Sequence, residues 1–153
     1  FLFSYRGYNN SYGCRDRLAT RIAGVAAVLV ALFPTGAPHD SLTLSWWAPY
    51  MAIIHSISAT VLFCSFSFFC LLQFPLSDPE KALSPNKQAR NRMYRFCGAA
   101  IIVSMLWTMI NALQSKSIFW SEASALEFFA VAWLVKGRAS QATMKAWNKI
   151  FGR

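Results

Sequence analysis

Three ionisable side chains interrupt the long apolar stretches of this 153-residue chain and are its first candidates for chemistry. They are His55, Glu122 and Glu127. If the apolar stretches cross a membrane, each such group costs about 2.5–3.5 kcal/mol at a central position, so it needs a partner or a purpose. These residue types suit the binding of a proton, a cation or a polar headgroup.

The depth of each group follows from its distance along a helix, which rises about 1.5 Å per residue. His55 lies about 12 Å into the second apolar stretch, and Glu127 about 13.5 Å into the fourth. We therefore predict that His55 and Glu127 face each other at one level of a helical bundle. Glu122 lies only about 6 Å in, at the level of Asn111.

These groups define a candidate ligand or proton site in the outer half of the bundle. Glu122 and Glu127 are five residues apart and project about 140° apart around a helix, so they cannot both point at one site. The candidate site residues are His55, Glu127, Ser56, Ser58, Glu122 and Asn111. A structural alternative stays open, in which a His55–Glu127 hydrogen bond or a protonated Glu127 fixes the helix register.

Most other chemistry is disfavoured by the sequence. It contains no GxGxxG, Walker A, GxSxG or HExxH motif. A haem with two axial histidines is excluded because His39 falls in an outer loop, which leaves His55 as a single possible axial ligand. The four cysteines show no CxxC spacing. No cofactor or metal is indicated, and an enzyme is less expected than a binding protein.

The elements that must position these residues are transmembrane helices. Hydrophobic residues make up 56% of the chain and charged residues 14%, whereas soluble domains carry about a quarter charged residues. A span needs about 20 mostly apolar residues. Four segments qualify: 18–34, 47–74, 96–113 and 118–135. We predict an all-α integral membrane protein, an antiparallel helical bundle in which the last two spans form a hairpin.

Charge predicts the orientation of this bundle. Of the 15 Lys and Arg residues, all but Lys116 fall on one side of the predicted spans. Because Lys and Arg accumulate in cytoplasmic loops, both ends of the visible chain are predicted to be cytoplasmic in a bacterial inner membrane. The net charge of +9 therefore fits anionic lipid headgroups, not nucleic acid.

The predicted layout has three parts. Residues 1–17 combine the end of a truncated span with a cytoplasmic segment, residues 18–137 form the membrane bundle, and residues 138–153 form a basic amphipathic tail. The tail is expected to lie on the inner leaflet, with a partly disordered tail as the alternative. A capping pattern at 77–80 and the helix-start pair Ser84-Pro85 predict a short surface helix before the third span.

Short motifs along the chain resemble those of a family of uncharacterised bacterial inner-membrane proteins, loosely similar to DRAM and Frag-like proteins. The motifs are Phe33-Pro34-Thr35, His55 with Ser58-Ala59, Asn91-Arg92, Tyr94-Arg95, Cys97-Gly98, Glu122 and Ala132-Trp133-Leu134-Val135-Lys136-Gly137. The resemblance implies six helices, of which the last four are visible here. It implies no reaction and no functional residues.

Three functions remain in competition. The leading hypothesis is the binding of a lipid or a small polar ligand in the outer half of the bundle. The second is an accessory subunit of a larger membrane complex, which docks through the small residues Ala23, Gly24, Ala27 and Ala31 of the first span. The third is a proton-coupled transporter that uses Glu127. The expected partners are membrane lipids and possible membrane-protein subunits.

Overall fold

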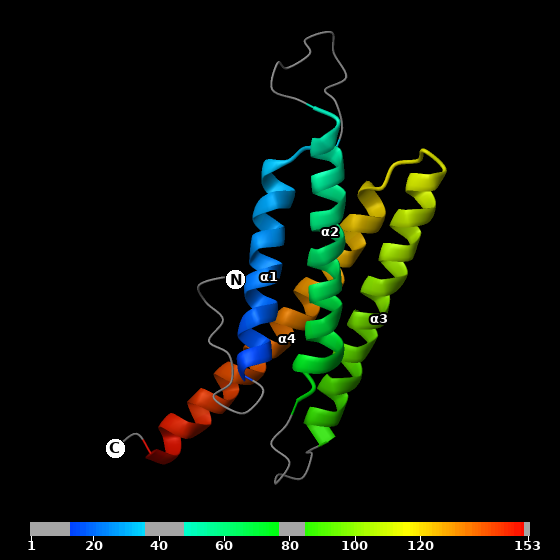
Figure 1. The fold of residues 1–153 in the computed structure, drawn as a ribbon. Helices are drawn as coiled ribbons and strands as arrows, with labels where there is room; N and C mark the ends of the chain where they lie inside the picture. The colour runs from blue at the N-terminus through cyan, green and yellow to red at the C-terminus, as the bar shows by residue number, and fades with distance from the viewer. Residues whose placement is uncertain (1–12, 36–47, 77–84, 152–153) are drawn as a thin grey trace. The chain divides into compact units, whose positions relative to one another are not determined.

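The computed structural model describes residues 13–35, 48–76 and 85–151, and the side chains of 17–35, 48–76 and 86–138. Within these ranges the chain is helical and contains no strand (Figure 1). The elements are α1 (Gly13–Leu32), α2 (Tyr50–Phe68), the π-helix η1 (Phe69–Gln73), α3 (Pro85–Leu113) and α4 (Phe119–Phe151). The all-α class is thereby confirmed for the described ranges. The predicted segment 1–12, the loop with His39 and the capping pattern at 77–80 lie outside them.

Two of the helices are long and apolar enough to cross a membrane. They are Tyr50–Gln73, which joins α2 to η1 over 24 residues, and Asn86–Leu113 of α3, with 28 residues. At about 1.5 Å per residue each exceeds the roughly 30 Å of hydrocarbon in a bilayer. Helices α1 and α4 cover the other two predicted spans but are not among the helices that are long and apolar enough by this measure. Their crossing of the membrane stays a prediction.

The helices extend beyond the predicted spans at two places. Helix α3 begins at Pro85 and runs without a break to Leu113, so the Ser84-Pro85 start signal leads directly into the third span. Proline suits this first position because its missing N–H is unpaired there in any helix. Helix α4 continues to Phe151, which makes most of the predicted tail helical. Its position on the inner leaflet stays a prediction.

The chain divides into two compact units, Phe1–Phe66 and Ser67–Arg153. In the first unit, α1 buries Thr20, Ala23, Gly24 and Ala26. The spacing of three and four residues places these small side chains on one face of the helix. Of the four small residues predicted to form a docking face, Ala23 and Gly24 are buried, whereas Ala27 and Ala31 are exposed.

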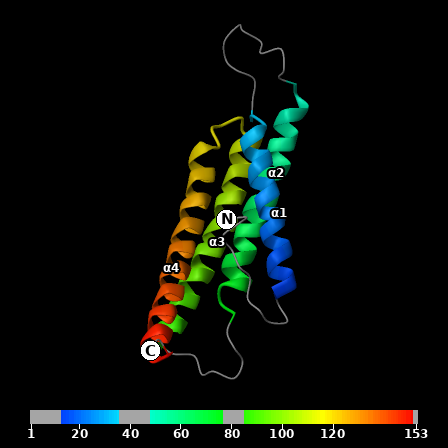
Figure 2. The ribbon, with the colours of Figure 1, turned by 90° about the vertical axis from the view of Figure 1, so that its left-hand side faces the viewer.

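In the second unit, α3 and α4 pack against each other as an antiparallel hairpin (Figures 1 and 2). Segment η1 packs against α3. The close approach falls at Gly98, where an added Cβ would lie 2.6 Å from Leu71 Cγ and 3.1 Å from Cys70 Cβ. The lack of a side chain at Gly98 therefore leaves the space that Leu71 and Cys70 of η1 occupy beside α3. Helices α3 and α4 thus form an antiparallel hairpin, and that both of them cross a membrane stays a prediction.

The pattern of burial differs from that of a soluble core. Hydroxyl and amide side chains are buried: Thr20, Ser58, Ser67, Gln73, Ser104 and Ser121. Large apolar side chains are exposed on every α-helix, and examples are Leu18, Val25, Ile53, Ile57, Phe96, Val103, Trp120 and Leu134. Soluble monomers rarely expose contiguous apolar patches beyond a few hundred Å².

Candidate functional site

His55 is fixed by the end of α1. Its Nδ1 lies 2.6 Å from the carbonyl oxygen of Phe33, the residue that follows α1. Because a carbonyl only accepts hydrogen bonds, Nδ1 carries the proton and Nε2 of the neutral ring is left as an acceptor. The bond links two segments of the first unit. It also sets the tautomer with which His55 can meet a ligand.

The hydroxyl groups beside His55 are directed to their own helix. Ser56 Oγ donates to the carbonyl of Ala52 at 2.8 Å, and Thr60 Oγ1 donates to the carbonyl of Ser56 at 2.8 Å. Such bonds to the preceding turn satisfy a hydroxyl on an apolar helix without any outside partner. Ser58 is buried. The hydroxyls of Ser56 and Thr60 therefore need no ligand to be stable in their places.

Glu127 is different, because its side chain is exposed on α4. Its surroundings along the helix are apolar, with exposed Leu126 before it and exposed Val131 and Leu134 after it. Within the described residues, Glu127 has no hydrogen bond or ion pair. His55 belongs to the unit Phe1–Phe66 and Glu127 to the unit Ser67–Arg153, so their predicted pairing stays a prediction.

Asn111 lies at the turn end of the second unit, by which we mean residues 108–122. Its Nδ2 donates to the carbonyl of Ser117 at 3.2 Å, and its own carbonyl accepts from Lys116 N at 2.9 Å. Together with the 3.1 Å bond from Ser115 N to the carbonyl of Ala112, this forms a Schellman motif at the end of α3. Asn111 therefore has a structural role in closing the hairpin.

Two hydroxyls join the helices just inside this turn. Thr108 Oγ1 lies 2.8 Å from Ser121 Oγ and 2.9 Å from the carbonyl of Ser104. Ser121 Oγ donates to the carbonyl of Ile118 at 2.8 Å, so it accepts from Thr108. Glu122 follows in the first turn of α4, where the helix dipole favours a negative charge. Hydroxyl pairs of this kind hold membrane helices together.

Sequence reasoning placed the cations of the second unit on one side but missed the contacts that they make there, at what we call the basic end. This end comprises η1, residues 74–76, the start of α3 from Lys87 to Arg95, and Lys136 with Arg138 of α4. Three successive carbonyls there accept side-chain hydrogen bonds, from Lys136 to Phe74 at 3.1 Å, Asn91 to Pro75 at 3.4 Å and Lys87 to Leu76 at 3.4 Å. The last carbonyls of a helix have no partner within it and carry partial negative charge, so cations suit them.

Phe74 is the centre of this basic end. It is almost completely buried and makes ring contacts with Phe69, Tyr94, Phe129 and Trp133 at centroid distances of 5.4 to 6.4 Å. Lys136 Nζ lies 5.5 Å from the centroid of its ring, within the range of a cation–π contact. Lys136 therefore makes both a hydrogen bond to the carbonyl of Phe74 and a cation–π contact with its ring.

The wide turn of η1 makes this arrangement possible. The amide of Phe74 donates to the carbonyl of Phe69 at 2.8 Å, a bond across five residues. The π-helix buries Phe69, Cys70 and Gln73. Such segments are rare and often mark functional sites. Pro75, directly after an apolar run, was the available sequence signal for a helix end at this place.

The basic end also groups charge. Because α3 and α4 are antiparallel, Lys87, Arg90, Arg92 and Arg95 share one end of the hairpin with Lys136 and Arg138. Lys116 is at the turn, the opposite end. Within the second unit, the structure thus preserves the charge asymmetry read from the sequence.

Two further observations limit the chemistry of the described part of the chain. No group of three His, Cys, Asp or Glu side chains there could hold a metal ion. Comparisons with protein-family models, curated proteins and solved structures find no match to the chain. The family resemblance noted in the sequence therefore stays an expectation, and the function has to be argued from the residues.

Proposed function

We propose that the protein is an integral membrane protein whose outer half binds an amine-bearing ligand, with a lipid headgroup as the first candidate. The membrane part rests on the exposed apolar side chains of all four α-helices. In the most apolar 18-residue stretch of α3, only 22% is buried, whereas the core helix of a soluble protein is mostly buried. Lipid chains are the environment that suits such a surface.

The basic end of the hairpin gives the proposed orientation. Its cations suit the cytoplasmic face of a bacterial inner membrane, and the turn with Lys116 suits the outer face. Glu127 then lies in the outer half, about 13.5 Å from the start of the fourth span. This orientation also agrees with aromatic Trp120 near the outer interface.

The single observation that carries the binding proposal is the exposed carboxyl of Glu127 on an apolar stretch of α4, which has no hydrogen bond or ion pair to any residue that the structure describes. A carboxylate in contact with lipid is costly unless it is neutralised. A ligand that brings a positive charge removes this cost and gains a charge-assisted hydrogen bond. Glu127 therefore selects a cationic partner.

His55 adds to the chemical definition of the ligand. With Nδ1–H donated to the carbonyl of Phe33, its Nε2 is an acceptor, as is the Glu127 carboxylate. Each of these acceptors on its own favours a ligand with N–H donors. The ammonium of phosphatidylethanolamine or of a small amine has this chemistry, whereas a phosphate or a carboxylate does not.

The test is a titration of the detergent-purified protein with phosphatidylethanolamine, with bound lipid counted by native mass spectrometry. Glu127→Gln keeps the shape of the side chain but removes the charge, and is expected to weaken binding about tenfold, the range of one charge-assisted hydrogen bond. Glu122→Gln removes an equal charge from the first turn of the same helix, and an equal loss of binding there would mean that negative charge alone attracts the lipid. Equal binding by the Glu127→Gln variant and the unmodified protein would refute the proposal.

A further inference from the structure

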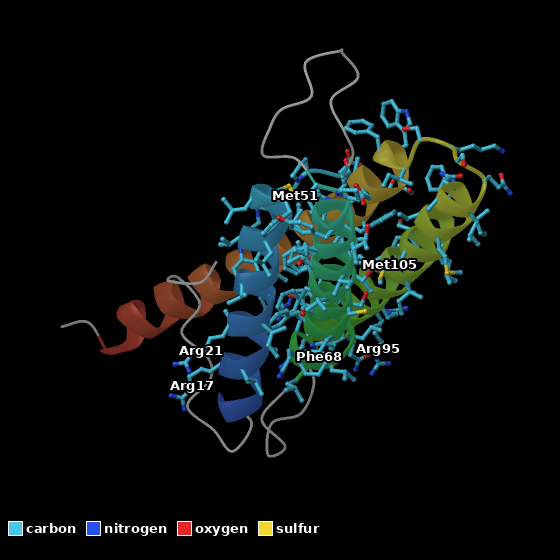
Figure 3. The ribbon with its side chains drawn as sticks, turned by 45° about the horizontal axis from the view of Figure 1, so that its top comes forward. Arg17, Arg21, Met51, Phe68, Arg95 and Met105 are labelled. Carbon is cyan, nitrogen blue, oxygen red and sulfur yellow. The ribbon has the colours of Figure 1, made fainter. Side chains whose placement is uncertain are left out.

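We propose that the exposed face of α3 is a binding surface for one anionic phospholipid of the inner leaflet, in which Arg92 and Arg95 bind the phosphate of the lipid. Both side chains are exposed, and neither pairs with a described residue. They are three residues apart and so lie on the same side of the helix. Arg95 projects outward from α3 (Figure 3).

Arginine is the side chain best suited to this ligand. Its planar guanidinium presents paired N–H donors that match two phosphate oxygens. Two other cations of the basic end are engaged elsewhere, since Lys87 and Lys136 donate to the carbonyls of Leu76 and Phe74. Arg90 lies two residues from Arg92, on another side of α3, and Arg138 belongs to α4. Arg92 and Arg95 are therefore the pair that remains available on this helix face.

An apolar stripe runs from these arginines along α3. Positions separated alternately by four and three residues are all exposed, and after Arg92 they are Phe96, Ala99, Val103, Leu106, Ile110 and Leu113. This spacing keeps the stripe on one face of the helix. Phe96 is 66% exposed and Val103 64%, so the face is open to a neighbour along its length.

The length of the stripe fits a single lipid. From Phe96 to Leu106 the helix rises about 15 Å, which is half of the roughly 30 Å hydrocarbon core. An acyl chain of the inner leaflet covers this distance when its phosphate lies at Arg92 and Arg95. One continuous face of α3 thus offers cations to the lipid headgroup and apolar side chains to its acyl chain.

A second copy of the chain is a less suitable occupant of the same face. Copies that pack in parallel along the stripe would bring Arg92 opposite its counterpart, and like charges in contact destabilise an interface. Copies that pack antiparallel would need opposite orientations in the membrane, although both carry the same charge asymmetry. An anionic lipid does not meet this difficulty, because its phosphate carries the charge opposite to that of Arg92 and Arg95.

The test compares binding of phosphatidylglycerol, phosphatidylcholine and inorganic phosphate to the purified protein by native mass spectrometry. We expect one tightly bound phosphatidylglycerol, little phosphatidylcholine and no competition by millimolar phosphate. In the double variant Arg92→Gln/Arg95→Gln, affinity for phosphatidylglycerol should fall about thirtyfold, as expected for two interfacial cations. Arg92→Lys/Arg95→Lys should retain part of the affinity.

The matched control is Arg90→Gln/Arg138→Gln, which removes the same two charges from the basic end but outside the stripe. It should bind phosphatidylglycerol as the unmodified protein does. An equal loss in both double variants would mean that charge alone attracts the lipid, and the proposal would be wrong. Displacement of the lipid by free phosphate, or a dimer that a Val103→Trp change dissociates, would overturn it equally.

Discussion

The two ends of the α3–α4 hairpin are closed by different kinds of contact. At the turn end, the hydrogen bonds join residues that are close in sequence, such as Asn111 with Ser117 and Thr108 with Ser121. At the basic end, Lys136 reaches Phe74 across 62 residues. Contacts between distant residues require more chain to be ordered before they form. The turn end is therefore specified locally, and the basic end depends on three elements meeting.

The ends differ in chemistry as well as in range. The turn end is held by backbone hydrogen bonds, the side-chain amide of Asn111 and hydroxyl groups. Its single lysine, Lys116, contributes its backbone N–H, which donates to the carbonyl of Asn111 in the Schellman motif. The basic end places cations against the carbonyls that follow η1 and against the ring of Phe74. Cations satisfy a helix C-terminus more strongly than neutral donors do. Substitutions at the basic end should accordingly have the larger effects.

The largest effect is expected at Gly98, where η1 meets α3. In Gly98→Ala, the new Cβ would lie 2.6 Å from Leu71 Cγ, so the π-helix or the Leu71 side chain must move. Overpacking of this kind costs about 1–3 kcal/mol. The free energy of unfolding, measured by SDS titration in mixed micelles with helical circular dichroism as the signal, should fall by that amount.

Gly137 provides the matched control for this prediction, because it lies in α4 with nothing within 4 Å of an added Cβ. Gly137→Ala should leave stability unchanged or raise it by up to about 1 kcal/mol, since alanine favours the helix. Loss of stability in both variants to the same degree would show that the contact between η1 and α3 is not the cause.

The next effect is expected at Lys136, which holds the carbonyl and the ring of Phe74. Lys136→Met keeps an unbranched apolar stem but removes the donor. A hydrogen bond to a charged group contributes about 1.5–3 kcal/mol, and solvent weakens it at this half-buried side chain, so the free energy of unfolding should fall by about 1–2 kcal/mol. The same SDS titration measures it. Arg138→Met removes an exposed cation two residues away and should change stability by less than about 0.5 kcal/mol. A larger loss from Arg138→Met than from Lys136→Met would contradict this account of the basic end.

The local features of the fold were predictable from the sequence. Long apolar runs and the Pro85 start signal predicted helices, and the short polar stretch at 114–117 predicted an antiparallel hairpin, because so short a connection leaves no other arrangement. The predicted helical tail rested on periodicity in the same way. Each of these depends on residues within about one or two turns of one another.

The basic end was not predictable because no single segment encodes it. A π-helix needs one extra residue in a turn, and its sequence, Phe69–Gln73, looks like any apolar helix. The bond between Lys136 and Phe74 arises only when α4 packs beside η1. For the candidate site, composition identified Glu127 and His55 as costly groups, but the bond from His55 to the carbonyl of Phe33 depends on the path of the chain after α1.

The smallest effect is expected at the turn end, where Ser115 has a positive φ of 54°. This left-handed conformation costs a residue other than glycine about 1–2 kcal/mol, whereas glycine adopts it freely but loses about 0.5–1 kcal/mol in chain entropy. Ser115→Gly should therefore raise the free energy of unfolding by about 0.5 kcal/mol. Ser115→Val, with a β-branched side chain that resists this conformation, should lower it. If glycine destabilised the hairpin instead, the turn would not be held by the Schellman motif, and the comparison of a locally specified end with a long-range end would fail.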